Sequence, residues 1–475
     1  MLGQGDRKVA VNLSLDSLPA ISDRVVKPTY RRSDLRPGIV HVGVGNFHRA
    51  HQAVYLHRLF QNGRDLDWAI LGAGVKSYDE NMRTRLEAQD WLTTVVELDP
   101  EGFSAEICAA MAGFAEVKAK ALIAAMSEPE IRIVSLTVTE GGYFIDAKTG
   151  GFDISNSEIV NDIASPETPS TVFGMIIAAL ANRRQKGIAP FTVMSCDNLP
   201  ENGHVARHAI LGLADAMPGD MGKWIAGNVA FPNGMVDCIT PATGEREIRL
   251  VEEEFGIIDA APVVCEPFRQ WVLEDKFSNG RPALETVGVE FVSDVAPYEL
   301  MKLRVLNGGH AAIAYPAALL GIKYGHEAME NPLVGGFYDK LAHDEIMPTV
   351  PPIPGVSLED YYKTLVKRFS NALLGDTIAR LCLDGSNRQP KFIFPTISAR
   401  LEANRPIRGL ALEVALWCRY CAAIDEKGNE IIIDDVAADR LRAQAKAAKS
   451  DPPKFLEMHE IFGTLNESQV FTEAF

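Results

Sequence analysis

The chain has 475 residues, 47% of them hydrophobic, which is enough for two or three domains with their own cores, and we expect two. Asp and Glu (63) outnumber Lys and Arg (47), and the formal net charge of -16 argues against a nucleic-acid partner. No apolar run approaches the ~18 to 20 residues that span a bilayer, and the N-terminus lacks the apolar core of a signal peptide. We therefore expect a cytoplasmic protein that binds no membrane.

The seven cysteines and two histidine pairs do not form a metal-site pattern. Cys418 and Cys421 form a CxxC, but it stands in a helical pattern without a second pair, so packing is the better interpretation. The HVARH segment (204–208) lacks the glutamate of HExxH, and the HxxH at 48–51 is a spacing that often arises by chance. We expect reduced cysteines and no metal.

The first structured segment is GIVHVGVG (38–45), whose apolar run ends in glycines as a buried strand does. Helical periodicity follows over 46–60, and WAILGAG (68–74) is the next strand, so these segments predict a βαβ unit. Strands and helices continue to alternate, with strands predicted at 92–98, 131–138 and 190–196 and helices at 171–187 and 203–217. This alternation predicts an α/β fold whose N-terminal domain is a Rossmann-type, doubly wound and mostly parallel sheet.

The pattern changes near Tyr298, after which long segments have helical periodicity and few strand signals. We expect a mostly α-helical C-terminal domain and place the boundary so that the two domains span 1–290 and 291–475. The proline-rich segment 347–355 is interpreted as a loop within the second domain.

The loop after the first strand, Gly43-Val-Gly45-Asn-Phe-His48, has the first two glycines of GxGxxG and a histidine in place of the third. The first two allow a tight turn and a close approach of the backbone to a pyrophosphate, whereas the third mainly serves helix packing. The setting between a strand and a helix favours dinucleotide binding over a purely structural turn. The predicted cofactor contacts in this loop are Gly43, Gly45, Asn46, Phe47, His48 and Arg49.

Asp79 is the acid that follows the second predicted strand. A Rossmann site for NAD places an acid there to hold the ribose hydroxyls. The carboxylate disfavours a 2′-phosphate whereas Lys76 attracts one, and we expect NAD in preference to NADP. The alternatives are a helix N-cap for Asp79 and a solvated surface charge for Lys76.

Four polar residues, Glu299, Lys302, Asn307 and His310, stand in one predicted helix. At about 100° per residue they fall within an arc of roughly 140° on one face, so that an acid, an amine, an amide and an imidazole converge. The apolar neighbours Leu303, Val305 and Leu306 lower the pKa of a lysine toward values that suit a general base. The alternative is a helix whose polar side faces solvent. It would be the better interpretation of any one of these residues alone, but not of all four together.

Seven long segments resemble one family, the polyol-specific long-chain dehydrogenases typified by mannitol 2-dehydrogenase. They are GIVHVGVGNFHRAHQ, IRIVSLTVTEGGY, FTVMSCDNLPENG, FPNGMVDCITP, CEPFRQWVLEDKF, MKLRVLNGGH and LCLDGSNRQPKF. The resemblance covers nearly the whole chain from about Gly38. It implies a zinc-independent enzyme that joins a Rossmann-type domain to a helical one and oxidises a sugar alcohol reversibly with NAD, with D-mannitol to D-fructose as the first expectation.

The resemblance also implies a role for each residue that matches the family's motifs. The implied catalytic residues are Lys302 as general base, Asn198 and Asn307 as an oxyanion hole, His310 as a holder of substrate hydroxyls, and Glu299 as a proton path to solvent. The implied polyol contacts are Asp237 and Arg380, each of which by itself fits an ordinary surface ion pair.

The chain departs from the family pattern at three places. Cys238 stands where the motif usually continues with arginine, and Tyr78 stands where close relatives often have a second acid. We expect altered cofactor or substrate affinity from the first change and weaker discrimination against NADP from the second. The chain ends at Phe475, whereas similar proteins usually continue with another helix, so we expect a truncated C-terminus.

Several alternatives stay open. Within the family they are oxidation of D-arabinitol or D-sorbitol and reduction of fructuronate or tagaturonate. Tyr298 and Lys302 fit the YxxxK of short-chain dehydrogenases, although those chains are much shorter and place the motif in the Rossmann domain. A protein that senses NAD without turnover is a further class, which the lysine and the two amides oppose. We expect a small-molecule partner and a monomer or weak oligomer.

Overall fold

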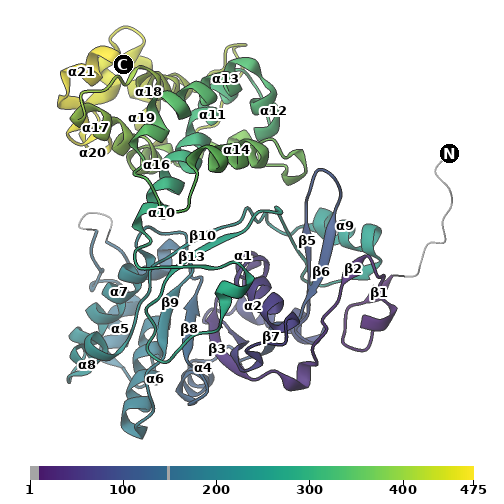
Figure 1. The fold of residues 1–475 in the computed structure, drawn as a ribbon. Coiled ribbons are helices and arrows are strands. Elements are labelled where there is room, and N and C mark those ends of the chain that lie inside the picture. Colours follow the sequence, from purple (N-terminus) through teal and green to yellow (C-terminus); the bar gives the residue numbers. More distant parts are fainter. Residues whose placement is uncertain (1–9, 147–149) are drawn as a thin grey trace, which may run out of the picture. The chain divides into compact units, whose positions relative to one another are not determined.

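The computed structural model describes residues 10–146 and 150–475 and divides the chain into two compact units, Met1–Val295 and Ala296–Phe475 (Figure 1). The first unit contains every strand of the described chain, and the second is helical. The predicted fold class is therefore confirmed.

The first unit is built on a parallel sheet of five strands. In spatial order they are β7 (Met111–Phe114), β4 (Ala69–Ala73), β3 (Pro37–Val42), β8 (Ile133–Leu136) and β9 (Thr192–Ser195). Counted along the chain within this sheet, the order is 3-2-1-4-5, which is that of a Rossmann sheet. The topological switch point lies beside β3, where ligands bind in folds of this kind.

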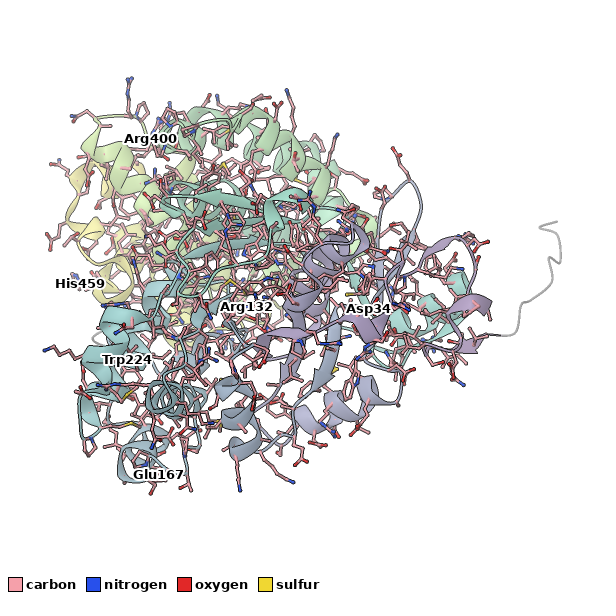
Figure 2. All side chains as sticks on the ribbon, turned by 60° about the horizontal axis from the view of Figure 1, so that its bottom comes forward. Asp34, Arg132, Glu167, Trp224, Arg400 and His459 are labelled. Carbon is pink, nitrogen blue, oxygen red and sulfur yellow. The ribbon has the colours of Figure 1, made fainter. Side chains whose placement is uncertain are left out.

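Helices cover both faces of the sheet because alternate residues of each strand point to opposite sides. Ile39 packs in one core with residues of α2 (Gln52–Gln61), and its neighbour Val40 packs in the other core. The helices that contribute to the second core include α4 (Ala119–Ser127), α6 (Val172–Lys186) and α7 (Asn202–Ala216). Arg132, labelled in Figure 2, holds the start of β8 next to the start of β4, since it donates to the Asp67 carboxylate and lies over the Trp68 ring.

One predicted strand of the doubly wound sheet lies elsewhere. Residues 92–98 form β5 (Thr93–Glu97), but β5 is antiparallel to β6 (Ser104–Cys108) in a separate sheet, because a short connection between consecutive strands permits only antiparallel pairing. That sheet has the order β12 (Val263–Cys265), β5, β6 and β2 (Val25–Val26). The remaining strands are β10 (Gly234–Asp237), β13 (Gln270–Glu274) and β14 (Glu290–Val292) in one sheet, and β1 (Val11–Asn12) and β11 (Ile257–Ile258) in another.

The predicted helix at 46–60 is divided at His51, whose φ of -120° and ψ of -89° are not helical. The parts are α1 (Asn46–Ala50) and α2. The other α-helices of this unit are α3 (Asp79–Glu87), α5 (Ser157–Ala164), α8 (Met221–Asn228) and α9 (Glu245–Phe255).

The second unit begins with α10 (Ala296–Met301), which continues into a π-helix at Lys302–Asn307 and then into α11 (Gly308–Leu319). A second π-helical turn spans Ala342–Ile346. The other α-helices are α12 (Gly325–Glu330), α13 (Pro332–Leu341), α14 (Leu358–Phe369), α15 (Ile378–Leu381), α16 (Gly385–Phe392), α17 (Phe394–Glu402), α18 (Arg408–Cys421), α19 (Ala438–Ala448), α20 (His459–Phe462) and α21 (Gln469–Ala474). Among the described residues, no helix has the length and apolar character that a membrane crossing requires.

Candidate active site

The glycine loop follows β3 at the switch point of the parallel sheet, and its two glycines have different surroundings. Gly43 has a φ of +97°, and a Cβ added there would lie 2.1 Å from the Thr137 carbonyl oxygen, so the turn requires glycine. Gly45 is exposed, and an added Cβ would be 4.0 Å from its nearest neighbour, the Gly43 oxygen. A ligand can therefore approach the Gly45 backbone, whose N–H donates to the Gly43 oxygen at 2.7 Å.

The side chains after the glycines fasten the loop to the rest of the unit. Asn46 donates to Thr243 Oγ1 (3.1 Å) and accepts from Arg49 Nη2 (2.7 Å), and Arg49 is buried and also donates to the Ala261 carbonyl. The Phe47 ring stacks on a neighbouring histidine ring at 4.8 Å. These predicted cofactor contacts thus have packing partners within the protein, and the backbone of the loop is the part that is left for an anion.

His48, at the position of the missing third glycine, is part of the core beneath the loop. Its ring is buried and stacks on the ring of His41, with centroids 3.4 Å apart and planes 11° from parallel. Burial holds the pKa of both imidazoles well below the ordinary value, so both rings are neutral.

Asp79 closes the loop that follows β4. Its Oδ2 accepts from the backbone N–H groups of Val75 and Lys76, both at 2.9 Å, and a Cβ added to Gly74 would collide with it. Asp79 is the first residue of α3 rather than its N-cap. Lys76 is paired with Glu158 at 2.8 Å, which reduces the positive charge that a 2′-phosphate would meet. Tyr78 is 70% exposed.

The buried Asp197 carboxylate joins the ends of β8 and β9. It accepts from the N–H groups of Val138 (3.0 Å) and Thr139 (2.9 Å) and from the Tyr143 hydroxyl (2.6 Å). Thr139 has a φ of +65°, which is rare for a β-branched residue and is held by this carboxylate. Asn198 follows directly and is exposed, so its position is set by a rigid neighbour.

Sequence reasoning did not single out Tyr143. The tyrosine is fully buried and also lies 2.6 Å from Ser195 Oγ, so its hydroxyl bridges strand and loop. The signal that could have found it is the EGGY segment, in which a polar aromatic follows two glycines directly after a buried strand.

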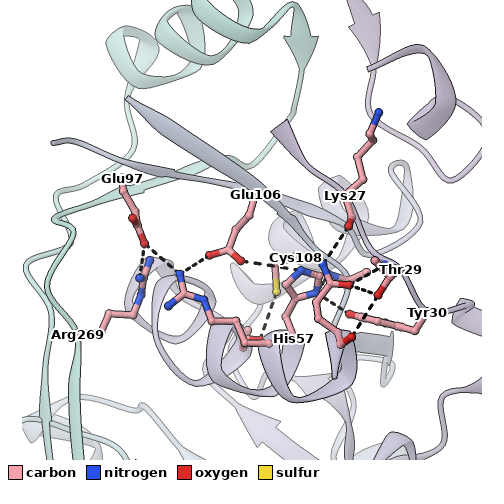
Figure 3. Close-up of polar contacts among 12 residues, drawn as sticks. Lys27, Thr29, Tyr30, His57, Glu97, Glu106, Cys108 and Arg269 are labelled. Atoms are coloured by element: carbon pink, nitrogen blue, oxygen red, sulfur yellow. Dashed lines mark hydrogen bonds and ion pairs between the residues drawn. The ribbon is translucent and has the colours of Figure 1, made fainter. Parts of the chain in front are cut away.

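Asp237 is the last residue of β10, is buried, and pairs in register with Gln270 of β13. The next residue, Cys238, forms a hydrogen bond with Cys265. Arg269 places Nη2 3.1 Å from Cys265 Sγ and forms an ion pair with Glu97 (Figure 3). An arginine thus lies beside the cysteine pair, although it comes from another part of the sequence than the family arginine.

The residues predicted to share one helix face lie on a helix of mixed type, which corrects the α-helical projection. Glu299 is in α10, Lys302 and Asn307 are the first and last residues of the π-helix, and His310 is in α11. A π-helix bonds residue i to i+5 and so has more residues per turn than the 3.6 of an α-helix, and the 100° step fails between Lys302 and Asn307. Such turns are frequent at functional sites.

Close packing holds this helix in place. Lys302 is buried, and the His310 ring stacks on Phe369 with centroids 4.3 Å apart. A Cβ added to Gly309 would lie 2.8 Å from the Tyr338 ring, so the glycine allows the close approach of α13. Both polar groups are thus presented by an ordered segment.

Arg380 has the surface ion pair that the sequence alone suggested. It is exposed and makes two hydrogen bonds with Asp376, at 2.6 and 2.5 Å. The seven cysteines are free and buried. In residues 10–146 and 150–475, no group of three or more His, Cys, Asp or Glu side chains could hold a metal ion.

The candidate residues form two groups. Asn198, Asp237 and the cofactor residues belong to Met1–Val295, and the helix from Glu299 to His310 and Arg380 belong to Ala296–Phe475. In the first group, the glycine loop and Asp79 follow the adjacent parallel strands β3 and β4. The second presents an amine, an amide and an imidazole on one ordered helix.

Comparisons with known proteins place both units in one family. The family model of the mannitol dehydrogenase Rossmann domain matches residues 37–286, and that of the mannitol dehydrogenase C-terminal domain matches residues 294–475. Mannitol 2-dehydrogenase of Cereibacter sphaeroides is 54% identical over 453 residues, which are 95% of this chain and 94% of the relative. Mannitol 2-dehydrogenase of Aspergillus oryzae is 43% identical over 461 residues, 95% of this chain and 92% of the relative.

Two solved structures agree with these matches. The ternary complex of Pseudomonas fluorescens mannitol 2-dehydrogenase with NAD and D-mannitol is 45% identical, with a TM-score of 0.86 over 98% of this chain and 95% of the other. A substrate-free D-sorbitol dehydrogenase is 35% identical, with a TM-score of 0.91 over 97% and 96% of the two chains. The family predicted from the sequence motifs is confirmed: the chain belongs to the mannitol dehydrogenases.

Proposed function

We propose that the protein is a mannitol 2-dehydrogenase that oxidises D-mannitol to D-fructose, reversibly and with NAD. The observation that carries this proposal is its likeness, along nearly the whole of both chains, to a mannitol 2-dehydrogenase solved with NAD and D-mannitol. The relative with 54% identity has the same name.

The residues of the first unit fit a bound NAD. The exposed backbone at Gly45 leaves room for a pyrophosphate, and the turn at Gly43 brings the loop to the end of the sheet. Asp79 is fixed through one carboxylate oxygen, and we propose that the other holds ribose hydroxyls. The pairing of Lys76 with Glu158 supports NAD over NADP.

The second unit would supply the proton chemistry. Bound NAD provides the nicotinamide that accepts the hydride from the carbinol carbon. We assign Lys302 as the base that takes the hydroxyl proton as the C–H bond breaks, so that alcohol and NAD give ketone, NADH and a proton. The burial of Lys302 supports this role, because a buried amine exchanges its proton with the substrate rather than with bulk water.

The amides would stabilise the reacting oxygen. We assign Asn198 and Asn307 as hydrogen-bond donors to that oxygen as its charge develops, a contribution that replaces the Lewis acid of metal-dependent alcohol oxidation. The rigid Asp197 and the π-helix support this assignment because donors must be held in place before the reaction. We further assign His310 and Asp237 to the substrate hydroxyls and Glu299 to the passage of the proton to solvent.

Oxidation of D-sorbitol is the second candidate. A D-sorbitol dehydrogenase has a TM-score of 0.91 to this chain, although its 35% identity is lower than that of the mannitol dehydrogenases. Arg380 would contact a polyol only if it broke its hydrogen bonds to Asp376. We therefore consider it a weaker candidate than Asp237 for a substrate contact.

A panel of substrates tests the proposal. D-mannitol, D-arabinitol and D-sorbitol are assayed with NAD or NADP, and D-fructose, fructuronate and tagaturonate with NADH or NADPH, by absorbance of the reduced cofactor. We expect the highest kcat/KM for D-mannitol with NAD. Faster oxidation of D-sorbitol than of D-mannitol, or faster reduction of a ketouronate than of D-fructose, would overturn the substrate assignment. A higher kcat/KM with NADP than with NAD would overturn the cofactor assignment.

A further inference from the structure

A buried histidine lies beneath the glycine loop without forming part of its surface. His41 is fully buried in β3, in register with Ser135 of β8. Its Nε2 lies 3.0 Å from Thr137 Oγ1 and 3.1 Å from the Gly43 carbonyl oxygen, and its Nδ1 lies 2.8 Å from Ser135 Oγ. The ring thus links two parallel strands to the first glycine of the loop.

Counting hydrogens assigns the direction of these bonds. The Thr137 hydroxyl donates its single hydrogen to the Gly43 oxygen at 2.5 Å, so Thr137 Oγ1 can only accept from His41. The Gly43 oxygen is also only an acceptor. The neutral His41 ring therefore carries its hydrogen on Nε2, and Nδ1 accepts from the Ser135 hydroxyl, which lies nearer to it (2.8 Å) than to the other acceptor within reach, Gln52 Oε1 (3.1 Å). In this arrangement the histidine orients the threonine hydroxyl, and both face the Gly43 carbonyl.

Holding a carbonyl also fixes the N–H on the other side of the same peptide. The peptide that joins Gly43 to Val44 is planar and trans, so its C=O and N–H point in opposite directions. The Gly43 oxygen also accepts from the Gly45 N–H at 2.7 Å, and with this oxygen turned toward Thr137 and His41 the Val44 N–H points away from those two side chains. At a residue with a φ of +97° such as Gly43, a free loop could turn this peptide over, since glycine accepts many backbone conformations.

We propose that His41 is a positioning residue for the dinucleotide: with Thr137 it holds the Gly43 carbonyl, and so presents the Val44 N–H to the cofactor pyrophosphate. This inference rests on the proposed NAD-dependent function. The stacked ring of His48 keeps the His41 ring in its plane, which gives a structural reason for a histidine where the third glycine of the motif would stand. His41 itself touches neither substrate nor cofactor.

Four variants of the full chain test the inference. His41→Phe keeps an aromatic ring for the stack and removes both nitrogens, Thr137→Val removes the hydroxyl, and Thr137→Ser retains it. His57→Phe is the matched control, because His57 is another fully buried neutral histidine, which lies in α2 and is bonded to Tyr30 at 2.7 Å (Figure 3). The dissociation constant of NADH is measured by fluorescence titration, together with KM for NAD, kcat and the thermal midpoint.

We expect His41→Phe and Thr137→Val to raise the NADH dissociation constant and KM for NAD by about tenfold, the effect of weakening one charge-assisted hydrogen bond, with kcat at saturating NAD within about twofold of the parent. Thr137→Ser should restore binding, and His57→Phe should lower only the thermal midpoint. An NADH affinity within twofold of the parent in folded His41→Phe or Thr137→Val overturns the inference, as does an equal loss of affinity in His57→Phe. If His41→Phe does not fold, the Thr137 pair decides. A parent that binds NADH but does not oxidise mannitol refutes the proposed function and leaves this test intact.

Discussion

Glu413 should make the stability of the protein fall as the pH rises through neutrality, and Glu413→Gln should remove that dependence. The carboxyl group is fully buried in α18, accepts from Gln389 Nε2 at 2.7 Å, and has a second oxygen without a partner among the described residues. Burial raises its pKa from 4.5 to about 8. The group is therefore mostly protonated in the folded protein at pH 7, where the unfolded chain would ionise it.

The sign and size follow from proton linkage. Below pH 4.5 both states are protonated and Glu413 has no effect, and above that pH the unfolded state releases a proton that the folded state retains until about pH 8. At about 1.4 kcal/mol per pKa unit, the cost grows to ~2 kcal/mol at pH 6 and ~5 kcal/mol above pH 8. Glutamine has the same shape and can still accept from Gln389, so the variant should lack this cost.

The measurement is urea denaturation of the parent and of Glu413→Gln at pH 6, 7, 8 and 9, followed by circular dichroism. We expect the free energy of unfolding of the variant, relative to that of the parent, to increase by roughly 3 kcal/mol from pH 6 to pH 9. Glu402→Gln, the same change at an exposed position of α17, is the control for the loss of one negative charge. A difference between parent and Glu413→Gln that stays constant from pH 6 to pH 9 would refute the reasoning.

Three further predictions concern the candidate site. Lys302→Ala should lower kcat by about 10² to 10⁴-fold and Tyr298→Phe should leave it within about threefold, since the lysine is the proposed base; the reverse result in steady-state assays would favour a tyrosine base. Gly43→Ala should cost at least ~2 kcal/mol in urea denaturation, because its Cβ meets the Thr137 carbonyl at a positive φ, whereas Gly45→Ala should cost less than ~1 kcal/mol; equal costs would contradict the loop geometry. Asp79→Asn should raise the ratio of kcat/KM for NADP to that for NAD by about tenfold, because a carboxylate repels the 2′-phosphate, and an unchanged ratio would exclude Asp79 from the ribose site.

Local sequence patterns were sufficient to predict the strands, but not to predict which strands pair with one another. The apolar run that ends at Gly43 predicted a buried strand, and β3 lies at the centre of the parallel sheet. The run at 92–98 has the same apolar character, yet β5 pairs with β6 and β12 in another sheet. Periodicity shows which face of a strand is buried and contains nothing about which strand lies next to it.

The candidate site shows the same division between local and distant information. The amine, amides and imidazole could be named from motifs, because a metal-free oxidation needs those residue types. The π-helix could not, since the same side-chain periodicity serves an α-helix and the added residue per turn is decided by packing. His41 was also missed, because a single histidine in an apolar strand gives no indication that it bonds Ser135 of β8 and the following Thr137, 94 and 96 positions away.

The π-helical turn makes the number of residues between Lys302 and Asn307 a determinant in its own right. Deletion of Leu303 would leave every polar side chain of the segment in place while allowing α-helical bonding, which turns Glu299 and Lys302 about the helix axis relative to Asn307 and His310. Among natural variants of this chain, substitutions at 303–306 should therefore be tolerated far more readily than any insertion or deletion there. In this helix, the spacing of the polar residues should matter as much as their identity.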